Sequence, residues 1–195
     1  ISGSKKNIAD HYDLGNEFFA SWLDPTLTYS SGIFDDFEST SLERAQINKF
    51  RRIANTLDLK KGQKVLEIGC GWGGFVEFAA SEIGVNITAL TISEAQYKFV
   101  KNRIDSNNIG HNATVILEDY RQHKGSYDKI ISIEMLEAVG EQYWQEYFSS
   151  IANNLVKGGE ALLQVITIPD DIFAAYRKNV DFIQKYIFPG GMLIP

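Results

Sequence analysis

A glycine-rich turn between a short apolar strand and a helix is the feature that most limits how this chain can fold. Residues 65–74 read VLEIGCGWGG. Glycines at such a turn let the backbone bend tightly and approach a ligand closely, and a ligand-binding loop of this kind requires a strand before it and a helix after it. An ordinary strand-to-helix turn has the same pattern, so the ligand has to be inferred from the surrounding residues.

Strand and helix patterns alternate from residue 63 onward. We expect strands at 64–68, 86–91, 113–117, 129–133 and 161–168, and helices at 73–82, 93–106, 144–155 and 169–187. Strands that are apolar on both faces are typical of a parallel sheet covered by helices on both sides. Ser93 and Gln96 predict a capping box, whereas Gly158 and Gly159 predict the end of a helix. Ligands of such a sheet bind beyond the carboxyl ends of its strands.

The N-terminal part has a different character, with aromatic residues at helical spacing. Thr40 and Glu43 predict a capping box at the start of its second helix. We therefore expect a helical N-terminal cap over residues 1–60 that contributes to the site, followed by a ligand-binding domain over residues 61–195. Because no further strand pattern follows the fifth strand, we expect the C-terminal strands of that domain to be missing from this sequence.

Composition excludes several classes of protein. The 195 residues are 44% hydrophobic and 23% charged, which is typical of a folded domain. The formal charge of −6 argues against nucleic-acid binding. One cysteine and three histidines argue against a disulfide scaffold and against a metal site. No apolar run approaches the roughly 20 residues of a membrane span and no signal peptide is evident, so we expect a cytoplasmic protein.

The residues around the glycine turn discriminate between nucleotide ligands. A phosphate-binding P-loop needs a lysine after the glycines, and a dinucleotide site needs an acid at the end of the next strand. Neither is present. Instead Glu67 precedes the glycines and Asp119 follows the third strand. This arrangement resembles the S-adenosylmethionine loop of class I methyltransferases, which implies a Rossmann-like α/β fold, with Glu67 near the methionyl amine and Asp119 near the adenine.

A narrower resemblance covers nearly the whole chain. The matching segments follow one another in the same order: HYDLGN at 11–16, WLDPT at 22–26, TYSS at 28–31, the turn at 67–74, TIS at 91–93, DYR at 119–121, SIEMLEAVG at 132–140 and FPGG at 188–191. Together they resemble the family of cyclopropane-fatty-acyl-phospholipid synthases and mycolic acid methyltransferases.

This resemblance implies a cofactor site for S-adenosylmethionine, residue by residue. Gln96 has a second interpretation as the capping partner of Ser93, and Tyr29 has one as a core aromatic residue. The implied cofactor residues are Tyr29, Ser30, Glu67, Gly69, Cys70, Gly71, Gly73, Thr91, Gln96, Asp119, Tyr120 and Arg121.

The resemblance also implies a bicarbonate ion held by Glu137, with Gln164, Ser31 and Tyr12 as further catalytic residues. Two positions depart from well-studied members of the family, which have cysteine at the position of Ser31 and histidine at that of Gln164. Glutamine forms hydrogen bonds but carries no positive charge. The departures therefore bear on the anion site and on ring closure, and leave methyl transfer itself untouched.

The function that the resemblance implies is methyl transfer to the double bond of an unsaturated acyl chain of a phospholipid, with formation of a cyclopropane ring. Methyl branching without ring closure, a small-molecule methyltransferase and a binding domain without turnover remain alternatives. We expect phospholipid acyl chains at the membrane surface as partners, no nucleic acid, and peripheral attachment at the inner face of the membrane. A homodimer is expected from the resemblance alone.

Overall fold

A single parallel sheet forms the centre of the molecule. The structure, a computed structural model, describes residues 15–195, so Tyr12 lies outside the described residues. Five parallel strands are arranged in the order β3-β2-β1-β4-β5. The strands are β1 (Lys64–Ile68), β2 (Asn86–Thr91), β3 (Ala113–Leu117), β4 (Tyr127–Ile133) and β5 (Leu155–Gln164). The predicted parallel α/β fold is confirmed.

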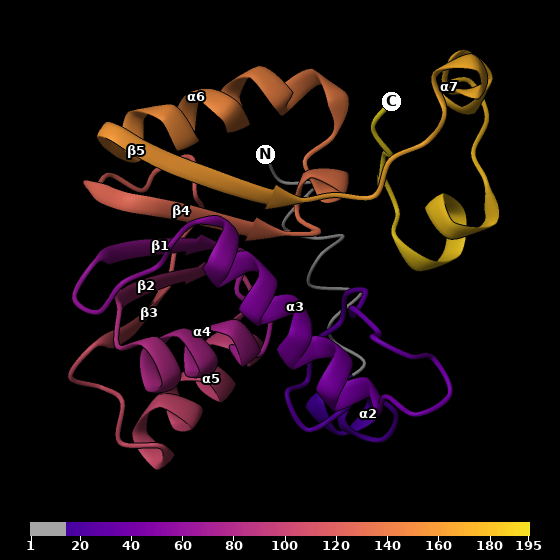
Figure 1. Cartoon of the computed structure of the whole chain (residues 1–195). Helices are drawn as coiled ribbons and strands as arrows, with labels where there is room; N and C mark the ends of the chain where they lie inside the picture. The colour runs from indigo at the N-terminus through magenta and orange to yellow at the C-terminus, as the bar shows by residue number, and fades with distance from the viewer. Residues whose placement is uncertain (1–14) are drawn as a thin grey trace.

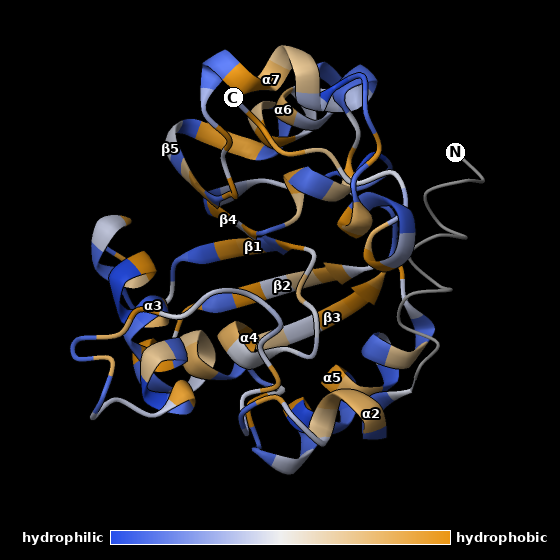
Figure 2. Ribbon diagram, turned by 90° about the vertical axis from the view of Figure 1, so that its right-hand side faces the viewer, coloured by the Kyte–Doolittle hydropathy of each residue, from blue (hydrophilic) through white to orange (hydrophobic). Residues whose placement is uncertain are grey.

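Helices cover both faces of this sheet (Figure 1). Because side chains alternate along a strand, Val65 and Leu66 of β1 point to opposite faces. Val65 lies in a core cluster with residues of α3, α4 and α5, while Leu66 lies in a second cluster with Tyr147 and Ile151 of α6. The helices are α3 (Leu42–Thr56), α4 (Gly74–Phe78), α5 (Glu94–Ser106) and α6 (Trp144–Asn154). Figure 2 shows hydrophobic residues along β3 and toward the carboxyl ends of β1 and β2.

The N-terminal segment packs against the glycine turn. Phe19 of the short helix α2 (Asn16–Ala20) forms a third buried cluster with Leu27 and Trp72. Trp72 also donates a hydrogen bond from Nε1 to Asn16 Oδ1 at 2.9 Å. The turn after β1 therefore anchors the N-terminal segment beside the carboxyl edge of the sheet.

One predicted helix cap is wrong. Ser41, and not Thr40, caps α3, since the Ser41 side chain accepts a hydrogen bond from the Arg44 N–H group. The Thr40 hydroxyl instead accepts from the Asp36 N–H group in the preceding turn. The helix predicted at 73–82 is α4 followed by the π-helical turn η1 (Ala79–Ile83).

Gly158 and Gly159 do not end a helix, because they lie inside β5. Tyr127 of β4 pairs with Leu155, but Lys129 pairs with Glu160, so β5 holds extra residues between these two pairs. Glycine at positive φ accommodates such a bulge, and Gly158 has φ of 81°. This is why β5 begins earlier than the predicted strand at 161–168, and it ends at Gln164.

The C-terminal segment is not one helix. It contains α7 (Asp170–Tyr176) and the π-helical turn η4 (Ile183–Ile187), with a break between them. Asp181 starts a new turn there, since its side chain accepts from the Gln184 N–H group at 2.7 Å. None of the helices in the described part is both long enough and apolar enough to cross a membrane.

Candidate active site

The candidate site lies where the strand order reverses. β1 pairs with β2 on one side and with β4 on the other, so the loops after β1 and β4 leave the sheet side by side. Open parallel sheets bind their ligands in the crevice outside the carboxyl ends of the strands at such a point. In Figure 1 the arrowheads of β4 and β5 point toward the side that holds α7 and the C-terminal segment.

The turn after β1 provides a backbone surface that a ligand can approach. Gly69, Gly71 and Gly73 all have positive φ, at 81°, 53° and 80°. A Cβ atom at Gly71 would meet no described atom within 4 Å, whereas one at Gly69 would lie 3.0 Å from Met135 Sδ. The loop is therefore packed at Gly69 and open at Gly71, which fits a bound cofactor lying over its backbone.

Cys70 takes part in this turn through its backbone. Its N–H group and that of Gly69 both donate to the Leu90 carbonyl at 3.0 Å, which ties the turn to β2. The Cys70 side chain lies in the core, and burial raises the pKa of its thiol. The thiol therefore packs within the protein and does not face the crevice.

A buried carboxyl group stands at the end of β1. Glu67 is 2% exposed, and its Oε2 atom has no hydrogen-bond partner among the described residues. Burial raises the pKa of Glu67 to about 8, with Lys49 of α3 acting in the opposite direction. A buried acceptor without a partner is rare in folded proteins. It fits the methionyl ammonium group that the resemblance assigns to Glu67.

Lys49 is a site residue that the sequence analysis missed. It is 1% exposed and donates from Nζ to Ser30 Oγ, so it holds the loop that carries Tyr29 and Ser30. Burial lowers the pKa of Lys49 to about 8, and the charges of Glu134, Asp24 and Glu67 oppose that effect. The signal in the sequence is a lysine on the apolar face of α3, one turn after Ala45 and one turn before Ile53.

Thr91 and Gln96 come together at the carboxyl end of β2. Thr91 Oγ1 donates to Gln96 Oε1 at 2.8 Å and accepts from the Ser93 N–H group at 3.1 Å. Ser93 caps α5 as predicted, since its side chain accepts from the Gln96 N–H group. The second half of the predicted capping box is wrong, because the Gln96 side chain bonds to Thr91.

Asp119 and Arg121 form a close ion pair after β3. Both carboxylate oxygens of Asp119 accept from the Arg121 guanidinium, and Asp119 Oδ1 also accepts from the Arg121 N–H group. This pairing raises the pKa of Arg121. Tyr120 between them packs edge-on against Tyr147 in the core, and burial raises its pKa to about 12.

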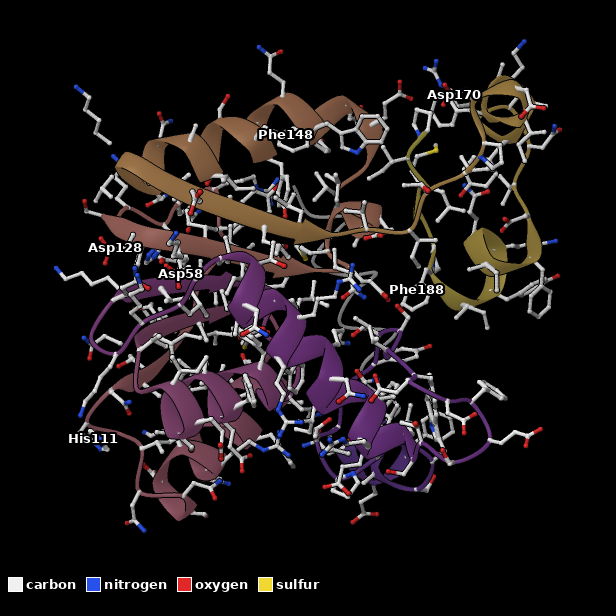
Figure 3. All side chains as sticks on the ribbon, viewed as in Figure 1. Asp58, His111, Asp128, Phe148, Asp170 and Phe188 are labelled. Atoms are coloured by element: carbon white, nitrogen blue, oxygen red, sulfur yellow. The ribbon has the colours of Figure 1, made fainter. Side chains whose placement is uncertain are left out.

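Tyr29 packs between the N-terminal helix α2 and the C-terminal segment. The centre of its ring lies 5.6 Å from the ring centre of Phe19 and 5.8 Å from that of Phe188. Burial raises the pKa of the Tyr29 hydroxyl. Figure 3 shows Phe188 on the opposite side of the molecule from Asp58, Asp128 and His111. The N-terminal loop and the C-terminal segment therefore meet beside the candidate site.

A second polar cluster surrounds Glu134, directly after β4. Glu134 Oε1 accepts from the Ser31 N–H group at 2.9 Å, from Ser31 Oγ at 3.0 Å and from Gln164 Nε2 at 2.8 Å. Ser31 and Gln164 were expected at the anion site, whereas Glu134 was not. The available signal was an acidic residue placed directly after an apolar strand.

Glu137 lies next to this cluster. Its Oε1 atom accepts a hydrogen bond from the Ile166 N–H group, and its backbone carbonyl accepts one from the Met192 N–H group at 2.8 Å. Its Oε2 atom has no hydrogen-bond partner among the described residues. Burial raises the pKa of Glu137, and the charge of Glu134 adds to that effect. The Glu137 carboxyl group therefore bonds to the residues that follow β5, and Glu134 takes the donors of Ser31 and Gln164.

The strand order and the turn after β1 define the fold of a class I S-adenosylmethionine-dependent methyltransferase. A family model described as mycolic acid cyclopropane synthetase matches residues 2–195. The chain therefore belongs to that family. The open backbone at Gly71 and the Glu67 oxygen that has no hydrogen-bond partner in the described part of the chain fit the cofactor of this fold.

Relatives and solved structures agree with this assignment. The chain is 40% identical over 97% of its length to tuberculostearic acid methyltransferase from Mycobacterium tuberculosis. It is also 40% identical over 94% of its length to cyclopropane-fatty-acyl-phospholipid synthase from Escherichia coli. It covers 46% of each, so it spans about half the length of these relatives. A crystal structure of a mycolic acid cyclopropane synthase complexed with SAH and CTAB superposes with a TM-score of 0.88 and 33% identity, covering 97% of this chain and 70% of the other.

Proposed function

We propose that the protein transfers a methyl group to the double bond of an unsaturated acyl chain of a phospholipid and closes a cyclopropane ring. The observation that carries this proposal is the presence of two carboxyl groups, Glu134 and Glu137, after β4 and beside the turn that fits the cofactor. Methylation of an alkene leaves a cation that must lose a proton, so the reaction needs a proton acceptor close to the methyl donor. Family membership supports the lipid substrate.

Different residues at the crevice are expected to contact different parts of the cofactor. When bound, S-adenosylmethionine supplies a methyl group activated by a positively charged sulfur. Glu67 is expected to bind the ammonium group, and Gly69, Gly71 and Gly73 are expected to bring the backbone close to the ligand; the partnerless oxygen of Glu67 among the described residues and the positive φ angles of the glycines support these roles. Thr91 ends β2 and bonds to Gln96 of α5, and Asp119 follows β3; the resemblance assigns these residues to contacts with the ribose and the adenine.

The N-terminal segment serves as a cap over this crevice. Residues 16–31 pack on Trp72 of the turn and lead directly to Ser31, which contacts Glu134. Closing the crevice excludes water, which would otherwise add to the cation and yield a hydroxylated product. The resemblance implies bicarbonate as the proton acceptor, with Glu137, Gln164, Ser31 and Tyr12 around it, and a carboxylate of the chain itself is the alternative acceptor.

The C-terminal segment offers an apolar surface for the lipid. Side chains of the stretch from α7 to η4 are exposed even though they are large and hydrophobic, namely Ile172, Val180, Phe182, Ile183 and Tyr186. Exposed apolar patches of this kind mark interaction sites, including membrane surfaces. The patch supports the proposed peripheral attachment to the membrane, which we expect at its inner face. Homodimer formation also remains a prediction, and sedimentation analysis would test it.

Methyl branching without ring closure is the second candidate. A relative at 40% identity is named for tuberculostearic acid, and Ser31 and Gln164 replace the cysteine and histidine of well-studied family members. Both reactions begin with the same methyl addition and differ in which proton is then lost.

Mass spectrometry of the lipid product tests the proposal and separates the two candidates. The full-length protein is incubated with unsaturated phospholipid vesicles and methyl-labelled cofactor. We expect a product that is heavier by one CH₂ group and resists alkene-specific chemistry. A product of the same mass that still reacts as an alkene would favour methyl branching. No labelled lipid from a protein that binds the cofactor would contradict the proposed function.

A further inference from the structure

The donors expected to bind an external anion are already bound to a carboxylate of the chain. Ser31 contributes its N–H and hydroxyl groups and Gln164 its amide, and all three contact Glu134 Oε1. Because a carboxylate only accepts hydrogen bonds, Gln164 presents its NH₂ group and Ser31 its hydroxyl proton. These donors come from the N-terminal loop and from the end of β5, and the carboxylate that accepts from them follows β4. Three distant segments thus converge on one oxygen atom.

The backbone of Glu134 supports a role in the reaction. Its φ angle of 48° is in the left-handed region, which a side-chain-bearing residue rarely adopts. Residues held in such conformations cluster at active sites, where the surrounding structure maintains them. The Glu134 N–H group donates to the Gln164 carbonyl at 2.8 Å, so one residue of β5 holds both the backbone and the side chain of Glu134.

The cluster is open to a ligand on one side. Ser31 is exposed, and Glu134 and Gln164 are half-buried. No described residue donates a hydrogen bond to Glu134 Oε2, while Oε1 takes all three donors. One oxygen thus orients the carboxylate and the other remains for a proton.

We propose that Glu134 accepts the proton in the reaction proposed above, and that its side chain takes the place of bicarbonate. This inference rests on the proposed function. After the methyl group has bonded to one alkene carbon, a C–H bond of that methyl group breaks. Its electron pair forms the last bond of the ring, and the proton passes to Glu134 Oε2. The positive charge of the lipid and the negative charge of the carboxylate are both neutralised, so no oxidant or reductant is required.

The first experiment replaces Glu134 in the full-length protein and removes bicarbonate from the buffer. Loss of a general base typically costs 10²–10⁴-fold in rate, so Glu134→Gln is expected to lower turnover by roughly 100-fold or more. Cofactor binding, measured by calorimetry, is expected to be unchanged, as is the turnover of the exposed control variant Glu82→Gln. Wild-type turnover should not depend on bicarbonate. Dependence of the wild type on bicarbonate, or full activity of Glu134→Gln, would overturn the inference.

The second experiment measures the binding of bicarbonate to the pocket independently of turnover. Glycine tolerates the φ angle of position 134, so Glu134→Gly removes the carboxylate and releases the donors of Ser31 and Gln164. Isotope-labelled bicarbonate is followed by its NMR line width. We expect no broadening with the wild type, broadening with Glu134→Gly, and recovery of turnover in that variant when bicarbonate is added. Binding of bicarbonate by the wild type, or none by Glu134→Gly, would count against the inference.

The two experiments also separate the inference from the function on which it rests. If the wild type methylates no unsaturated phospholipid, the proposed function fails, while the bicarbonate titrations still report whether Glu134 fills the anion pocket. If the wild type makes a cyclopropane lipid only with added bicarbonate, the function stands and the inference fails.

Discussion

Lys49 and Glu67 are both buried, and the charge of each opposes the effect of burial on the pKa of the other, which lies at about 8 for both groups. Lys49 comes from α3 and Glu67 from the end of β1. Burial disfavours the charged form of each group, whereas the opposite charge of the other group favours it. A ligand cation at the unpaired Glu67 oxygen would favour the ionised carboxyl group, so ligand binding is linked to pH at this position.

The first prediction concerns stability without cofactor. The pKa of Glu67 rises from 4.5 in the unfolded chain to about 8 in the folded protein, so the folded state binds more protons between these values. Its contribution to the free energy of unfolding therefore falls as pH rises from about 5 to about 8. Glu67→Gln is expected to reduce this fall by on the order of 4 kcal/mol, since the roughly three pKa units between pH 5 and pH 8 are worth about 1.4 kcal/mol each. Urea unfolding across that pH range measures it, and equal slopes for both proteins would contradict it.

The second prediction concerns cofactor binding at the same residue. Because a positively charged ammonium group favours the ionised form of Glu67, the affinity for S-adenosylmethionine should increase as pH rises from about 6 to about 8. Glu67→Gln should weaken binding by about tenfold or more, the effect of roughly 1.4 kcal/mol. It should also remove the pH dependence that Glu67 contributes. Calorimetric titrations at several pH values provide the measurement, and Glu82→Gln at an exposed position of η1 is the control.

The third prediction compares two glycines with similar backbone constraints. Gly71 and Gly62 both have positive φ, and a Cβ atom at either position would meet no described atom within 4 Å. Alanine should cost about 1–2 kcal/mol of stability at each position because of the left-handed backbone. Only Gly71→Ala should also weaken cofactor binding, because only Gly71 lies in the turn after β1. Equal cofactor affinity for the two variants would show that the ligand does not approach Gly71.

The fourth prediction tests the role assigned to Glu137. Its side chain accepts from the Ile166 N–H group and its carbonyl accepts from Met192, so Glu137 holds the chain that follows β5. We expect Glu137→Gln to lower methyl transfer while cofactor binding is unchanged. Burial raises the pKa of Glu137, so the loss should be smaller at low pH, where the wild-type carboxyl group is itself neutral. Full activity of the variant across the pH range would show that the Glu137 carboxylate is not needed for methyl transfer.

The fifth prediction concerns the lipid surface. Phe182 and Tyr186 are 66% and 61% exposed, and their rings lie 5.2 Å apart. Replacing both with alanine should weaken binding to vesicles of unsaturated phospholipid, because the apolar contact with the lipid is lost. Flotation of the vesicles measures this binding. Phe148 on α6 is 49% exposed and provides the control substitution. Unchanged vesicle binding of the double variant would reject a lipid contact by this segment.

Local sequence signals predicted much of the fold because they act through neighbours along the chain. Three of the five strands, β1, β2 and β3, have the predicted bounds, and Ser93 caps α5 as expected. The errors arose where tertiary contacts compete with local preference. Gly158 and Gly159 belong to a bulge that pairing with β4 imposes, and the C-terminal helix breaks where Asp181 starts a new turn.

The sequence by itself determined the ligand-binding turn, because glycine spacing and the preceding strand are properties of consecutive residues. It also determined the class of fold and, through Glu67 and Asp119, the class of cofactor expected. Only the tertiary structure decided which acidic side chain meets Ser31 and Gln164. These two residues are separated from Glu134 by 103 and 30 positions, so no local pattern pairs them. The same holds for Lys49, whose burial depends on the packing of α3 against the sheet.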